Sequence, residues 1–345
     1  MKLLSVISLL LVLGTVQSQT VLTVRQGYDN GIDLFGDVQS AIDVAQGGDL
    51  IEIYPGSYPG FVVNKPLRIV GTGYGVLENY PELGTLTGQV SITGTVAFMG
   101  AASGSGLESF SCQTLQIHNT NQLLLRRLRV RKSFDIKDAS DLQFEQCFID
   151  ANQSVADSKA VLLQGNVLVS FDHCLLVSPA TSYSSGGNNY SIGDQHGSHV
   201  SATFDHCFFS VQPGFNRGQG QLSFRNSILI SGTGGSISAT PDYDLSITHN
   251  VFRPNASFDG TNLYGVPSAS IYQTTGSFDG KYQLIDGSPA IGFATDGGDC
   301  GPYEGINAYV PSGLPRTPTI TGLEMLPNVT IGAGMQVSLK GKTQN

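Results

Sequence analysis

The chain contains the segment FDHCLL at residues 171–176 and repeats it almost unchanged as FDHCFF at residues 204–209. Each copy starts with a large apolar residue, passes two polar residues and a small one, and then becomes apolar again. Related segments stand at residues 144–149, 224–229 and 247–252, with a weaker copy at 125–130. Self-similarity at a few tens of residues predicts a solenoid, in which each repeat is one turn of a coil. Because the repeats are rich in Phe, Val, Ile and Leu and are punctuated by Gly, Asn and Ser, we expect short strands.

The composition supports an all-β protein. The 345 residues include 43 glycines, and only 13% are charged, which is typical neither of a helical bundle nor of a disordered chain. The length suits a coil, because its core grows by adding turns. The formal net charge of −9 argues against a nucleic-acid partner.

The chain begins with Lys2 and an apolar run at residues 3–16, which predicts a secretion signal cleaved before Gln19. The run is too short to span a membrane well and no other candidate follows, so we expect no membrane span. The predicted organisation is a signal peptide (1–18), a coil domain (19–310), and a Pro-rich exit with a short β tail (311–345). The tail is expected to form one or two strands on the coil, or to be a linker remnant. We expect the protein to be secreted or attached to the cell surface.

Three of the five cysteines occupy the same place in successive repeats: Cys147, Cys174 and Cys207. Same-place residues in a coil stack at roughly 4.8 Å. The sequence therefore predicts a buried ladder of free thiols, continued by Ser227 and Asn250, rather than a disulfide framework. The spacing of the cysteines does not fit a zinc site.

The N-terminal part predicts a cap for the coil. A strand is expected at residues 21–24, and a short helix follows the capping residue Asp37 and stops at Gly47 and Gly48. Such a helix covers core and strand edges that an open coil would expose. Further strands are expected at 49–54, 61–63 and 67–70, with turns at 55–58 and 71–75.

Two segments resemble a known group. The run GDLIEIYPGSY at residues 48–58 resembles the opening of right-handed parallel β-helix proteins of the pectin-lyase-like superfamily. The run LIDGSPAIG at 284–292, followed by Asp296, Asp299 and the triplet 301–303, resembles the closing segment of secreted bacterial members. The resemblance covers about residues 21–309 and implies an all-β, right-handed parallel β-helix with a short N-terminal capping helix. It implies no particular activity, because this superfamily holds lyases, hydrolases, esterases and proteins of unknown role.

The repeated Asp-His pair supplies the catalytic candidates, Asp172, His173, Asp205 and His206. Stacked repeats place the two carboxylates roughly 5 Å apart, a separation that suits retaining glycoside hydrolysis. The histidines are candidate bases, and the carboxylates are candidate ligands for calcium. The alternative is a structural ladder, in which Arg126 pairs with Glu145 and Asp205 pairs with Arg225.

Two further groups are binding candidates. Arg127, Arg129 and Arg131 are expected to alternate outward as a basic strip facing an acidic sugar polymer, unless Arg131 simply pairs with Asp150. Residues 178–200 are expected to form a loop that lengthens one turn. Its cluster of Asp194, His196 and His199 is expected to act as a wall beside a groove, and no metal site is predicted there.

The sequence therefore favours a non-catalytic module that associates with carbohydrate or a cell surface. The alternative is a polysaccharide lyase or glycoside hydrolase that uses Asp172 and Asp205, and whether the protein is an enzyme stays open. The expected partner is an extracellular polysaccharide. No cofactor is expected, with calcium as the one candidate ion.

Overall fold

A computed structural model describes residues 19–81, 88–150, 159–177, 190–230, 237–253, 258, 260–315, 319–325 and 337–342. The predicted signal peptide lies outside these residues. In the part that is described, no helix is long and apolar enough to cross a membrane.

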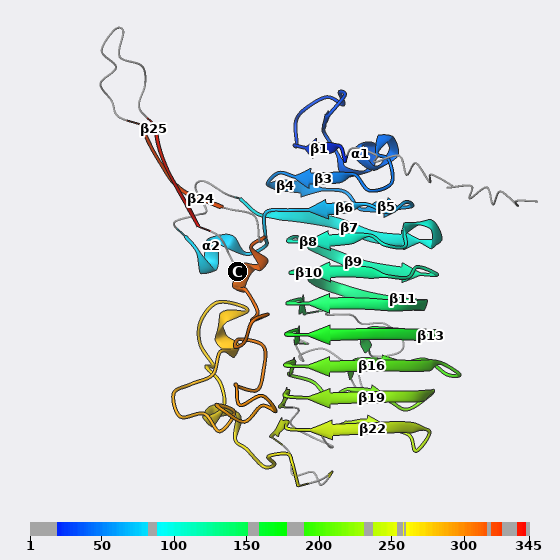
Figure 1. Ribbon diagram of the computed structural model, residues 1–345, viewed down its shortest axis with the longest axis vertical. Helices are drawn as coiled ribbons and strands as arrows, with labels where there is room; N and C mark the ends of the chain where they lie inside the picture. Colours follow the sequence, from blue (N-terminus) through cyan, green and yellow to red (C-terminus); the bar gives the residue numbers. More distant parts are fainter. Residues whose placement is uncertain are drawn as a thin grey trace, which may run out of the picture.

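The long strands stack in parallel, one per turn of the coil (Figure 1). They are β11 (Arg129–Glu145), β13 (Lys159–Asp172), β16 (His199–Asp205), β19 (Gln219–Arg225) and β22 (Tyr243–Thr248). Their register places Phe144, Phe171, Phe204, Phe224 and Ile247 in one column, as the repeats predict. The rings of successive phenylalanines stack with centroids 4.9, 5.2 and 4.7 Å apart. The fold is a parallel β-helix.

A sharp corner follows each long strand. The second polar residue of each repeat has a left-handed backbone, with φ between 47° and 55° for Gln146, His173, His206, Asn226 and His249. A short strand then begins: β12 (Phe148–Ile149), β14 (Leu175–Leu176), β17 (Phe208–Phe209), β20 (Ile228–Leu229) and β23 (Val251–Phe252). A left-handed residue turns the chain sharply within one position, which is why the side-chain alternation of the strand stops there.

The cysteine ladder is confirmed. Cys147, Cys174 and Cys207 are free and buried at the corners. The ladder continues into the later turns, since the backbone N–H of Cys207 donates to the Ser227 hydroxyl and that of Ser227 donates to the Asn250 side chain.

The N-terminal cap is also confirmed. Helix α1 (Val38–Val44) is capped by Asp37, which accepts a hydrogen bond from the Ser40 N–H at 2.9 Å, and it buries Val38, Ala41 and Ile42. Around it lie β1 (Val21–Val24), β2 (Leu34–Phe35), β3 (Leu50–Ile53), β5 (Phe61–Val63) and β6 (Arg68–Val70).

The turn predicted at residues 55–58 is wrong in part. Residues Gly56–Tyr58 form strand β4, which pairs in parallel with β7 (Val90–Met99). The remaining elements between the cap and the long strands are α2 (Val76–Asn79), η1 (Gly100–Ala102), β8 (Gly106–Glu108), β9 (Ser111–His118) and β10 (Leu123–Arg126). The later turns of the coil have a further short strand besides the long strand and the short strand after the corner. These further strands are β15 (Tyr190–Asp194), β18 (Gly214–Phe215) and β21 (Ser238–Ala239).

After the last turn the chain runs back along the flank of the coil (Figure 1). This return segment, residues 260–315, includes η2 (Ser268–Ser270), η3 (Gly280–Tyr282) and η4 (Pro311–Gly313). It contacts the corners of the coil in reverse order. Cys300 contacts the carbonyl of His249 at the last corner, and the Leu314 carbonyl accepts a hydrogen bond from Arg127 at an early corner. Between coil and return segment lies a second apolar core, which includes Phe148, Phe208 and Tyr282.

The tail was expected to form one or two strands on the coil, or to be a linker remnant. Strands β24 (Thr319–Met325) and β25 (Val337–Lys342) instead pair with each other antiparallel in a two-stranded sheet of their own.

Candidate functional site

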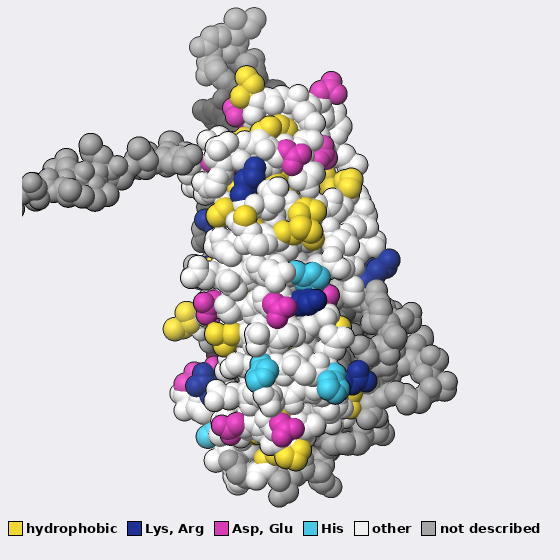
Figure 2. Space-filling view, turned by 90° about the vertical axis from the view of Figure 1, so that its right-hand side faces the viewer, with side chains coloured by type: hydrophobic (Ala, Val, Ile, Leu, Met, Phe, Trp, Pro, Cys, Tyr) yellow, Lys and Arg dark blue, Asp and Glu magenta, His cyan; other side chains and the backbone are white. Residues whose placement is uncertain are grey.

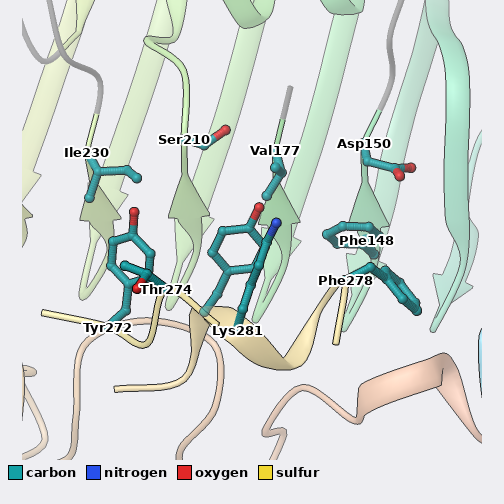
Figure 3. A pocket seen from close by; sticks show the side chains of 10 residues that line it. Phe148, Asp150, Val177, Ser210, Ile230, Tyr272, Thr274, Phe278 and Lys281 are labelled. Atoms are coloured by element: carbon teal, nitrogen blue, oxygen red, sulfur yellow. The ribbon is translucent and has the colours of Figure 1, made fainter. Parts of the chain in front are cut away.

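A groove of about 360 Å³ lies between the short strands and the return segment (Figure 3). We call it the flank groove. Its floor is a row of side chains that each follow a short strand: Asp150, Val177, Ser210 and Ile230. Backbone hydrogen bonds join successive turns at this row, for example from the Val177 N–H to the Ile149 carbonyl at 2.8 Å. Three strand spacings make the row roughly 14 Å long. The flank groove is therefore elongated along the coil axis.

The opposite wall is aromatic. It comes from the return segment and contains Tyr272, Thr274, Phe278, Lys281 and Tyr282 (Figure 3). Phe148 of the coil packs beside it. Tyr272 and Tyr282 both pack against Phe208, with ring centroids 5.2 and 4.8 Å away. These contacts hold the rings in place without a ligand, which lowers the entropy that a ligand must remove on binding.

The groove also contains two charged side chains of different character. Asp150 is already paired with Arg129 at 2.6 Å, and Arg129 lies over the rings of Phe148 and Phe278. Lys281 has its ammonium 5.1 Å from the Tyr282 ring centroid and no carboxylate partner among the residues that the structure describes. The groove thus offers one cation that is not neutralised by a neighbour.

Both tyrosines keep their protons. Burial raises the pKa of Tyr272, and burial followed by the proximity of Tyr272 and Asp150 raises the pKa of Tyr282. Neutral phenols can donate as well as accept hydrogen bonds, so the wall is amphipathic over the ordinary pH range.

The four catalytic candidates come together at two stacked corners, as the repeat predicts. Asp172 lies opposite Asp205 in the register, and the rings of His173 and His206 stack with centroids 4.6 Å apart. Nδ1 of His173 lies 2.8 Å from Asp172, and Nδ1 of His206 lies 3.1 Å from Asp205. None of the four is among the described residues that line the flank groove.

Their carboxylate oxygens already have partners. Oδ2 of Asp172 accepts from the Asn307 amide at 3.3 Å, while Asp205 pairs with Arg225 and accepts from the Asn226 amide at 3.0 Å. Burial acts to raise the pKa of Asp205, but the hydrogen bonds and charges of His206 and Arg225 outweigh it and hold this pKa below its usual range. The predicted pairs Arg225–Asp205 and Arg126–Glu145 are both present, the second at 2.6 Å.

The basic strip predicted from Arg127, Arg129 and Arg131 does not form. Arg127 is fully buried, because it occupies a left-handed corner (φ 51°) and points under the return segment, where it donates to Gln146 at 2.6 Å. Arg129 rather than Arg131 pairs with Asp150. Only Arg131 of the three is exposed.

Of the loop expected at residues 178–200, residues 178–189 lie outside the described residues, and the rest begins with β15 and ends in β16. The predicted wall of Asp194, His196 and His199 does not form. Asp194 is fully buried and accepts hydrogen bonds from the backbone of Asn216 and Arg217 and from the Tyr243 hydroxyl. Asp194 thereby holds the backbone of residues 216–217 in the next turn of the coil. His196 and His199 are exposed, and His199 lies beside Gln219 at 2.7 Å.

The face of the molecule in Figure 2 carries its charged and apolar side chains singly or in small groups. No broad basic area is visible there among the described residues.

The groove wall is marked in the sequence by a density of aromatic residues. Tyr264, Tyr272, Phe278 and Tyr282 fall within twenty residues of a stretch otherwise rich in Gly and Ser. Such a density of rings in a segment without strand periodicity is typical of a packed, ligand-facing loop.

No protein-family profile matches the chain, and no curated protein sequence matches it. Among solved structures, the chain is similar to the crystal structure of pectate lyase Pel9A. That similarity has 10% sequence identity and a TM-score of 0.45 over 82% of this chain and 96% of that chain. It is too distant to place the chain in a family or to give it an activity.

Proposed function

We propose that the protein is an exported, non-catalytic β-helix module that binds an extracellular polysaccharide in the flank groove. The observation that carries the proposal is the shape and lining of the groove. It is open and elongated, with a row of alternating polar and apolar side chains on the floor and tyrosines on the wall. An extended sugar chain presents apolar C–H faces to rings and hydroxyls to polar groups, which is the combination that such a lining accommodates.

The state of the Asp-His corners favours binding over cleavage. A general acid or nucleophile must be able to reach a scissile bond, whereas Asp205 is held by Arg225, His206 and Asn226. His173 is 6% exposed, and its second nitrogen is bonded to the Glu304 carbonyl at 2.9 Å. A lyase or hydrolase that uses these residues is the alternative.

The test is binding of the mature protein to a panel of neutral and acidic polysaccharides, with the size of each polymer followed in the same samples. Ser210→Trp fills the middle of the groove floor without removing core atoms, and Ser246→Trp, on an exposed position of β22, is the matched control. We expect at least one polymer to be retained by the wild type and the control but not by Ser210→Trp, with its length unchanged.

Shortening of a polymer, lost in Asp172→Asn with Asp205→Asn, would replace the proposal with the enzymatic alternative. Binding that survives in Ser210→Trp would remove the flank groove from consideration.

A further inference from the structure

We propose that Asp172, His173 and His206 form a binding site for a divalent transition-metal ion such as Zn²⁺, independent of the flank groove. Each of these residues places one ligand atom within 4.8 Å of the ligand atoms of the other two. Imidazole nitrogen and carboxylate oxygen together suit Zn²⁺ and its neighbours better than calcium, which wants an all-oxygen shell.

The hydrogen bonds of His173 call for a cation. The Glu304 carbonyl can only accept, so Nε2 of His173, 2.9 Å away, carries a proton. A neutral ring then presents the lone pair of Nδ1 to Oδ1 of Asp172 at 2.8 Å, and an ionised carboxylate is also an acceptor. Two acceptors at this separation need a proton or a metal ion next to both of them.

The separation is close to what one ion needs. Ligand atoms at about 2.0–2.2 Å from a tetrahedral Zn²⁺ lie about 3.4 Å from each other, so Nδ1 of His173 and Oδ1 of Asp172, which are 2.8 Å apart, must move apart by about 0.6 Å to admit the ion. A carbonyl that accepts from the second ring nitrogen is the usual support for a metal-binding histidine, because it fixes the tautomer and the ring orientation. Glu304 of the return segment supplies this support to His173.

His206 completes the set from the next turn. Its ring is nearly parallel to that of His173, at an interplanar angle of 5°, and it is partly exposed. Its Nδ1 lies 3.1 Å from Oδ1 of Asp205, and His206 must leave or share this contact when it turns toward the ion.

The surrounding charges are compatible with a cation. Arg225 lies nearby, but its charge is taken up by Asp205. The exposed carboxylate of Asp296 directly follows Thr295, whose N–H donates to the Asn226 side chain in the turn after His206. Asp172 and Asp296 therefore add negative charge to this side of the coil.

The experiment uses variants that the repeats themselves suggest. The corner position of His206 is Asn226 in the next turn, with nearly the same φ (47° and 53°), so His206→Asn should keep the coil folded. Asp172→Asn removes a second ligand with no change of shape. The control is His196→Asn with His199→Asn, which removes two exposed histidines outside the cluster.

Thermal unfolding is followed in chelator-treated protein with and without Zn²⁺, and the visible absorption of added Co²⁺ is recorded. A ligand present at about 100 times its Kd should raise Tm by roughly 4 °C for a chain of this size. We expect this rise, and a tetrahedral Co²⁺ spectrum, in the wild type and the control but in neither ligand variant. An unchanged wild-type Tm, or the same rise in His206→Asn and Asp172→Asn as in the wild type, would overturn the proposal and leave a proton between His173 and Asp172.

Discussion

Asp279 offers a direct probe of how the groove wall is held. Its side chain is fully buried in the return segment, beside Phe278 and close to Lys281. Oδ2 accepts from the Tyr309 hydroxyl at 3.0 Å and from the Ser312 N–H at 2.8 Å, and Oδ1 accepts from the Asn79 amide at 2.8 Å. The carboxylate thus ties the return segment to α2 of the coil.

Asp279→Asn keeps the shape but replaces one acceptor oxygen by a donor. If the new NH₂ takes the place of Oδ2, the Tyr309 hydroxyl can rotate to accept from it but the Ser312 N–H cannot. If the NH₂ takes the place of Oδ1, the Asn79 amide must flip to accept from it and gives up its bond to the Ser312 hydroxyl. At least one hydrogen bond of this buried group is therefore lost. One such loss costs about 1–3 kcal/mol, and we expect a loss of about 2 kcal/mol. The loss should fall on the return segment, because a solenoid turn depends chiefly on its neighbours.

Hydrogen exchange of native protein measures this locally. A loss of about 2 kcal/mol corresponds to an opening about thirtyfold more frequent. Amides of the return segment should therefore exchange about thirtyfold faster in Asp279→Asn, while amides around Phe204 in the coil stay as they are. Asp286→Asn, an exposed position of the same segment, is the control. Equal acceleration in coil and return segment, or none in either, would refute the idea that the return segment is a separately anchored layer.

Two further predictions concern the corners. Asp205→Asn should destabilise the protein by about 1 kcal/mol at neutral pH, since the pair with Arg225 is partly exposed and screened. Because folding lowers the pKa of Asp205, its contribution to the free energy of unfolding is present above the unfolded pKa of about 3.9 and is lost as the pH falls below that value. In urea unfolding, the difference in stability between wild type and variant should therefore shrink on acidification. A difference that grows in acid would contradict this pairing. All five cysteines are free and buried, and burial raises the pKa of Cys300 to about 12 and that of Cys147 and Cys174 well above the ordinary range. A thiol reagent should thus find almost none in native protein and five in unreduced, denatured protein, and a lower denatured count would mean that disulfides form.

The repeats were enough to predict the coil because its register is local and periodic. Phe171 and Phe204 align with each other whatever happens elsewhere, and the cysteine ladder follows from the same alignment. The cap was predictable for a similar reason, since the bond from the Ser40 N–H to Asp37 spans three residues.

The failures share a different cause, namely contacts between residues far apart in sequence. Arg127 was expected on the outside because alternation was continued through a corner whose left-handed φ ends it. Its partner, the Leu314 carbonyl, is 187 residues away, in a segment that is not part of the repeat pattern. Asp194 was expected in a wall beside a groove, but its backbone donors come from the following turn and bury it. Gly56–Tyr58 forms a strand because β7 pairs with it. The flank groove was missed since it exists only where the return segment meets the coil.

The central claim, that sugar chains occupy the flank groove, can be measured with a single fluorophore. The chain contains no tryptophan, so Tyr272→Trp places its only indole on the groove wall, and Tyr28→Trp places one at a site 46% exposed and remote in sequence. Titration with the polysaccharide retained in the panel should shift and saturate the emission of Tyr272→Trp while leaving Tyr28→Trp unchanged. Retention of the polymer with no change at Tyr272→Trp, or the same change in both variants, would contradict the account.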